Sequence, residues 1–246
     1  MIESGIMTSA VAGVLTGGAI ASLVGAVHVA PQALRPSAVG RMRSLCRRKQ
    51  MLCLTYDDGP GPNLTPRVLD LLDRHNAKAT FFLLGVRAEY RPDLVDRAKS
   101  RGHELACHSA RHLHGWKTMP ARARQDVDAG YVMLDRWVSP SSRFRPPSGK
   151  LSLGQYLSLR RRKAPIDWWT LDSGDTGSSL PSPESIWKSV KRGGGGVVLL
   201  HDMDRERDHD ARATYVLELT DLLLTRARDS GIRPGTLNEL FQEDRP

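Results

Sequence analysis

The sequence predicts an α/β protein in which parallel strands form a sheet or a barrel. Short apolar runs alternate with amphipathic helical segments after residue 49, and this alternation is typical of such folds. Polar clusters follow several of the apolar runs, as expected where function gathers at the carboxyl ends of strands. Of the 246 residues, 40% are apolar and 26% are charged, which excludes a disordered chain and a protein with many membrane spans.

The first expected element is one N-terminal transmembrane helix over residues 6–27. These 22 residues carry no charge, and a helix of that length extends about 33 Å, enough for a hydrocarbon core of about 30 Å. Gly13 and Gly17 have the spacing of a weak helix–helix pairing motif. A cleavable signal peptide or a buried helix is the alternative, but signal peptides begin with basic residues and here the early charge is Glu3.

Basic residues gather after this apolar stretch, with six arginines and lysines between residues 35 and 49. Because basic flanks resist translocation, the cluster favours a single-pass membrane protein whose larger part lies on the cytoplasmic face. The net charge of +9 then leaves only a modest excess for the remaining residues, so no nucleic-acid partner is expected. The expected organisation is a membrane segment with a basic linker over 1–48 and one domain over 49–246.

The domain is expected to begin with a buried strand over 51–56, an apolar run that ends in the turn-forming sequence Asp-Asp-Gly-Pro. A helix follows over 64–75, because apolar residues recur there at helical spacing and Asn63 is a suitable N-cap. Continuous apolar runs predict strands and helical spacing predicts helices in the rest of the chain, in this order: strand 79–84, helix 93–101, strand 103–108, helix 121–137, short strands near 143–145 and 166–171, helix 182–191, strand 196–200 and helix 214–228.

Two neighbouring carboxylates, Asp57 and Asp58, follow the first expected strand, although Asp, Gly and Pro also form ordinary turns. His108 and His112 are four residues apart, so on a helical turn both imidazoles would point the same way and chelate a divalent metal. With Asp58 they would make a site of two histidines and one carboxylate. Such a site suits zinc hydrolysis and non-haem iron chemistry equally.

Three later segments favour hydrolysis. Arg145 precedes a stiff Pro-Pro turn, where its guanidinium would hold a carboxylate. Asp175 follows the strand expected over 166–171, and His201 follows the last apolar run. A single histidine at a strand end is most often structural, so His201 gains its significance from the complete set of motifs.

Taken in chain order, these motifs resemble those of the polysaccharide deacetylase family, also called the NodB-homology domain or carbohydrate esterase family four. They read TYDDGP from residue 55, HSARH from 108, FRPPSG from 144, DSGD from 172 and VVLLHD from 197. The resemblance extends from about Lys49 to the end of the chain. It implies a distorted (β/α) barrel and a hydrolase that removes N-acetyl or O-acetyl groups from an acetylated carbohydrate.

The resemblance also implies a divalent metal, most often Zn²⁺, with Co²⁺ or another divalent ion as alternatives. By motif, Asp58, His108 and His112 correspond to the metal ligands and Asp57 to the catalytic base. In amide hydrolysis the metal polarises the carbonyl and lowers the pKa of a bound water, and the base accepts that water's proton.

The remaining motif residues correspond to supporting groups. Arg145 resembles the arginine that steadies the base, and a backbone N–H in the Pro147–Ser148 turn resembles the oxyanion donor. His201 is similar to the general acid that protonates the departing amine, and Asp175 to the carboxylate that orients it.

The sequence departs from the family pattern at Ser148 and Thr176, where an aromatic residue and a Trp, respectively, are common. The sequence therefore does not identify the sugar, and the candidates are chitin oligomers, peptidoglycan, an exopolysaccharide and a lipid-linked glycan. One alternative is a non-catalytic carbohydrate-binding relative, which would lack one or more of the catalytic residues. Another is an iron oxygenase with the same three ligands, which would not need Arg145 or His201.

Overall fold

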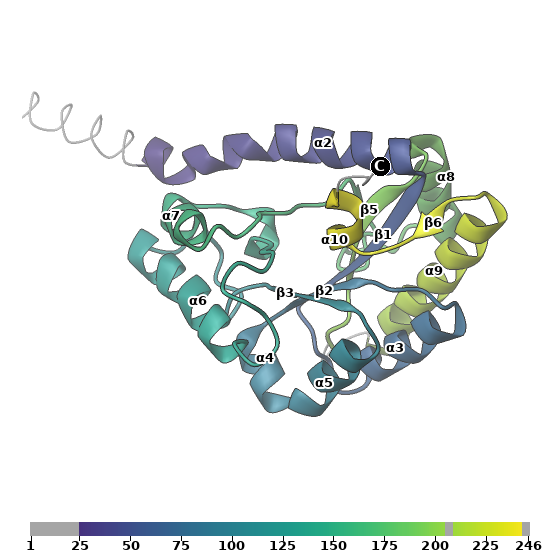
Figure 1. Cartoon of the computed structure of the whole chain (residues 1–246), viewed down its shortest axis with the longest axis horizontal. Coiled ribbons are helices and arrows are strands. Elements are labelled where there is room, and N and C mark those ends of the chain that lie inside the picture. Colours follow the sequence, from purple (N-terminus) through teal and green to yellow (C-terminus); the bar gives the residue numbers. More distant parts are fainter. Residues whose placement is uncertain (1–24, 205–208, 243–246) are drawn as a thin grey trace, which may run out of the picture.

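The computed structural model describes residues 25–204 and 209–242. In this part of the chain the strands pair in parallel and form one sheet in the order β3-β2-β1-β5-β4, with β6 paired to the first residues of β1 (Figure 1). The strands are β1 (Met51–Asp57), β2 (Thr80–Leu83), β3 (Glu104–Cys107), β4 (Leu171–Asp172), β5 (Gly196–His201) and β6 (Arg233–Pro234). The predicted α/β fold with parallel strands is therefore confirmed.

Helices surround the sheet and cover its central strand (Figure 1). Every residue of β1 is buried, as expected of a parallel strand covered on both faces. The helices are α2 (Leu34–Lys49), α3 (Leu64–Arg74), α4 (Gly85–Tyr90), α5 (Pro92–Ser100), α6 (Pro120–Met133), α7 (Leu153–Arg162), α8 (Pro183–Gly193), α9 (His209–Asp229) and α10 (Leu237–Phe241), with short 3₁₀ turns η1 (Ala30–Ala33) and η2 (Pro147–Gly149).

The strands expected near 143–145 and 166–171 are much shorter than the apolar pattern indicates. Phe144 forms isolated parallel bridges to Cys107 and to Ile166, and β4 contains only two residues. Prolines limit these segments, because a proline has no N–H to donate to a strand ladder and two of them follow Arg145 directly. In the described part of the chain, the structure also contains elements that the pattern does not predict, namely α2, α4, α7, α10 and β6.

The N-terminal region differs most from expectation. Helix α2 packs against β1 and β5, and its Met42 and Cys46 side chains are buried in the core. The basic segment is therefore largely a helix on the sheet, lying along one side of the molecule (Figure 1).

The expected single-pass membrane localisation is corrected by the structure. Among the described residues, no helix combines the length and the apolar character needed to cross a bilayer. Most of the segment predicted as a span, with Gly13 and Gly17, lies outside the described residues. The sequence predicts that residues 35–49 are the basic flank of a membrane helix. In the structure these residues belong to α2, which packs on the sheet.

A buried ion-pair cluster lies at the start of β3, the end of this strand that is farther from His108. Arg143 Nε lies 3.1 Å from Glu104 Oε1, and its Nη1 lies 3.0 Å from Asp167 Oδ2. We expect Arg143→Ala to lower the free energy of unfolding by about 3–5 kcal/mol, because it leaves two buried carboxylates without their cation.

Urea unfolding of the purified protein measures this effect. Arg136→Ala is the matched control, because its ion pair with Asp96 is largely exposed and its loss should change stability by about 0–1 kcal/mol. Equal effects of the two substitutions would show that the Arg143 cluster contributes no more than a surface pair.

Candidate active site

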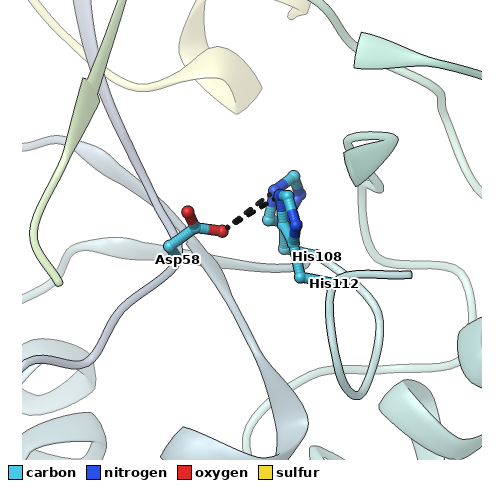
Figure 2. A group of neighbouring side chains, drawn as sticks. All are labelled: Asp58, His108 and His112. Carbon is cyan, nitrogen blue, oxygen red and sulfur yellow. Dashed lines mark ion pairs between the residues drawn. The ribbon is translucent and has the colours of Figure 1, made fainter. Parts of the chain in front are cut away.

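Three side chains converge at the carboxyl ends of β1 and β3. Asp58 directly follows β1, and His108 directly follows β3, with His112 in the same loop. Asp58 Oδ1 lies 3.4 Å from His108 Nε2 and 3.4 Å from His112 Nε2 (Figure 2). One potential ligand atom from each residue lies within 4.8 Å of the other two, which is a spacing that suits a single metal ion.

The two histidines converge through a loop, not through the helical turn that their spacing predicts. Ser109 and His112 have positive φ angles of 74° and 60°, and this left-handed backbone turns the chain back on itself. The Ser109 hydroxyl accepts a hydrogen bond from the His112 N–H at 3.1 Å. The buried Asp126 carboxylate of α6 accepts two more, from the N–H groups of Arg111 and Leu113.

The donor chemistry of this cluster fits a divalent cation. His108 Nδ1 lies 2.8 Å from the Arg145 carbonyl oxygen and donates to it, which leaves the Nε2 lone pair directed at Asp58. Burial lowers the pKa of His108 to about 3, although Asp58 opposes the shift, so the imidazole is neutral. Asp58 Oδ1 is buried and has no hydrogen-bond partner. Such orphaned acceptors are costly unless a cation satisfies them.

Asp57 is held next to this cluster by a fully buried arginine. Arg145 Nη1 donates to Asp57 Oδ1 and to Thr55 Oγ1, each at 2.7 Å, and Nη2 donates to the Trp168 carbonyl at 2.9 Å. The guanidinium also lies over the ring of Phe82, at 4.1 Å from its centroid. Burial raises the pKa of Asp57, and the positive charge of Arg145 limits the rise. The other oxygen of Asp57 lies 3.7 Å from His108 Nε2.

His201 ends β5 opposite Asp57, because the two residues are register partners across the β1–β5 pair. Asp175 holds it through two contacts, since His201 Nδ1 lies 2.9 Å from Asp175 Oδ1 and the His201 backbone N–H donates to Oδ2 at 2.8 Å. Burial alone would lower the pKa of His201, but the charge of Asp175 and its hydrogen bond raise it to about 9. The imidazole is therefore protonated at neutral pH.

The Pro-Pro turn closes the other side of the site. Ser148 lines the cavity and has a positive φ of 54°, whereas Pro147 is buried and does not line it. Gly149 must be glycine, because a Cβ there would lie 2.6 Å from the ring of Trp169. The cavity has a volume of about 320 Å³. It is lined by the convergent side chains Asp58, His108 and His112 and, in addition, by Asp57, Ser148, Gly149, Trp169, Asp172, Thr176, Leu199 and His201.

Several residues that the sequence reasoning missed support the site from behind. Arg87 donates to the Asp58 carbonyl at 2.6 Å, and Arg212 donates to the Asp175 carbonyl at 2.5 Å. Asp126 anchors the loop that carries His112. The sequence carries a signal for Asp126, because it lies at helical spacing from Ala123 and Gly130 on the face that α6 buries, and carboxylates on such a face are rare without partners. Arg87 and Arg212 look like ordinary surface arginines in the sequence and carry no such signal.

Comparison with known proteins gives concordant matches. The family model described as "Polysaccharide deacetylase" matches residues 44–161. A peptidoglycan-N-acetylglucosamine deacetylase of Bacillus cereus is 30% identical over 196 residues, which are 79% of this chain and 89% of the relative. A chitooligosaccharide deacetylase of Sinorhizobium fredii is 32% identical over 157 residues, 61% of this chain and 70% of the relative.

A solved structure has the same parallel α/β architecture. The crystal structure of the Bc1960 peptidoglycan N-acetylglucosamine deacetylase is 28% identical to this chain, with a TM-score of 0.69. The match covers 80% of this chain and 91% of that structure.

Proposed function

The chain belongs to the polysaccharide deacetylase family, and from this premise we propose that it removes N-acetyl groups from N-acetylglucosamine units of a glycan. It is a metal-dependent hydrolase that acts on an acetylated carbohydrate. Peptidoglycan and chitooligosaccharides are the proposed substrate classes, because these are named for its relatives. One observation supports the proposed site, namely that one cavity is lined by all of its expected reactive side chains: Asp58, His108, His112, Asp57 and His201. Arg145 holds Asp57 at this cavity, and Asp175 holds His201.

We further propose that residues 49–246 form the deacetylase domain and that its sheet is the distorted (β/α) barrel of the family. The bridges of Phe144 to Cys107 and Ile166 support this, because they continue the sheet beyond β3 toward the segment that leads into β4.

Asp58, His108 and His112 are the residues that would hold the metal. When bound there, a divalent ion supplies Lewis-acid polarisation of the acetyl carbonyl and lowers the pKa of a water toward about 7. We propose Zn²⁺, because two neutral imidazoles and one carboxylate are a common ligand set of catalytic zinc. Co²⁺ suits the same nitrogen and oxygen donors and is the alternative.

Asp57 acts as the general base in this proposal. It accepts a proton from the attacking water, and Arg145 holds the carboxylate in one orientation through the 2.7 Å hydrogen bond. Its buried position raises the pKa of the carboxyl and so makes it a stronger base than an exposed aspartate.

His201 acts as the general acid. Its protonated imidazole delivers a proton to the departing sugar nitrogen, which is a poor leaving group as an amide anion. Asp175 keeps the proton available by holding Nδ1. The Ser148 N–H, in the turn after Arg145, is the proposed donor to the oxyanion.

Acetate release from a panel of acetylated glycans tests the proposed function. Peptidoglycan, chitooligosaccharides and an O-acetylated glycan are each incubated with the zinc-loaded protein, and released acetate is quantified. Release from the N-acetylated members supports the proposal. Binding of the glycan without acetate release would favour a non-catalytic relative, and iron retention with oxygen consumption would favour an oxygenase.

The role of His201 predicts a pH effect of Asp175→Asn. Activity requires protonated His201, so it falls as the pH rises through the pKa of this group. Asp175 raises that pKa, so its neutralisation should move the alkaline limb of kcat/KM to lower pH by about one unit or more. Asp172→Asn is the control, because Asp172 borders the same cavity without contacting His201. An unchanged alkaline limb would remove His201 from the role of acid.

A further inference from the structure

A short segment before the family-matched region lies against the wall of the active site. Residues 28–35, here called the N-terminal strap, comprise His28, Val29, η1 and the start of α2. The family model matches residues 44–161, so the strap precedes the matched segment. His28 Nε2 lies 3.0 Å from the Gly115 carbonyl oxygen, so the strap also reaches the stretch that follows the His112 loop.

Gln32 makes the strap's most specific contact. Its Nε2 donates to the Gly149 carbonyl at 2.9 Å, and its Oε1 accepts from the Leu151 N–H at 2.8 Å. One side-chain amide therefore satisfies a backbone acceptor and a backbone donor two residues apart, as a neighbouring strand would. The Gly149 carbonyl also accepts from Trp168 Nε1 at 3.1 Å, so this carbonyl is held from two directions.

Arg35 makes a second contact with the same wall. Its guanidinium carbon lies 4.7 Å from the centroid of Trp169, a ring that lines the cavity and touches Gly149. Gln32 and Arg35 therefore contact the two neighbouring parts of one wall, namely the turn after Arg145 and the tryptophan packed against it. The contact is a cation–π interaction, which adds attraction beyond simple packing.

We propose that the N-terminal strap is a positioning element for the reaction and that Gln32 is its key residue. This inference rests on the proposed function, in which the Ser148 N–H is the oxyanion donor. Ser148 lies directly before Gly149, and its strained positive φ must be held by surrounding contacts. Gln32 supplies two such contacts one and three residues later. Because oxyanion donors act only when held in place, loosening the turn should lower kcat more than it raises KM.

Gln32→Ala and Gln32→Glu test the proposal with a chitooligosaccharide as substrate. We expect both variants to lower kcat by about tenfold or more while KM changes by less than about twofold, and zinc binding to stay stoichiometric. Gln32→Glu is the sharper variant, because its carboxylate still accepts from Leu151 but cannot donate to Gly149. Ser37→Ala is the control, since Ser37 lies in α2 just after the strap and its hydroxyl donates to the Leu34 carbonyl of the same helix. Wild-type kcat in both Gln32 variants would overturn the proposal.

Amide hydrogen exchange gives a readout that does not depend on activity. The Leu151 amide should exchange at least about tenfold faster in Gln32→Ala than in the wild type, with the melting temperature unchanged within a few degrees. If the wild type releases no acetate from any glycan, the proposed function fails, yet the exchange rate still decides whether Gln32 holds the turn. Unchanged Leu151 exchange in Gln32→Ala would refute the positioning role even in an active enzyme.

Discussion

His108→Ala is expected to abolish stoichiometric zinc binding and to lower acetate release by about a thousandfold or more, while the domain stays folded. His108 is buried at the end of β3, and its Nε2 is one of the three convergent ligand atoms. Among the described residues, the cluster contains no histidine besides His108 and His112, so none is available to replace His108. Losing one of three protein ligands removes most metal affinity, and metal-assisted activation of water is lost with it.

Metal analysis of dialysed protein together with an acetate assay measures this effect. His103→Ala is the matched control, because it also removes a buried imidazole, one that accepts the Ala79 N–H and lies outside the cluster. It should destabilise the fold yet retain zinc. Near-stoichiometric zinc in a folded His108→Ala protein would remove His108 from the ligand set.

Asp57→Asn is expected to retain the metal and to lose activity by about 10²–10⁴-fold. The substitution removes the proton acceptor but preserves the shape of the side chain and one acceptor oxygen for Arg145. Asp58→Asn is the informative comparison, because it should weaken zinc binding itself. The two variants differ by one position in the chain, so a reversed result would require the roles of the two carboxylates to be exchanged.

The candidate site could be predicted from the sequence because its chemistry is carried by short motifs at strand ends. Asp57, Asp58 and His201 follow apolar runs that form β1 and β5, and the parallel arrangement brings those ends together. The loop geometry was not predictable in the same way. The four-residue spacing of His108 and His112 is consistent with a helical turn, whereas the loop depends on Ser109 and on Asp126 from a different helix.

The N-terminal region was mispredicted for a related reason. Apolar length and flanking charge are properties of an isolated segment, and they led to the prediction of a basic linker up to residue 48. The packing of this region depends on partners far along the chain, since α2 packs against β5 and Gln32 of η1 binds backbone groups more than a hundred residues away. Only a few α2 residues are buried, so the apolar pattern of this helix is weak and gave no signal for its docking.

The pairing of Asp57 with His201 across β1 and β5 also restricts where residues can be inserted into this chain or deleted from it. Successive strand residues point to opposite faces, so one inserted or deleted residue in β5 would bring Leu200 or Asp202 opposite Asp57 and turn the imidazole away from the cavity. Insertions in the loops between strands and helices do not alter this pairing. Evolution and engineering can therefore add residues to the rim of the cavity to change the sugar it accepts, but the strands beneath must keep their length.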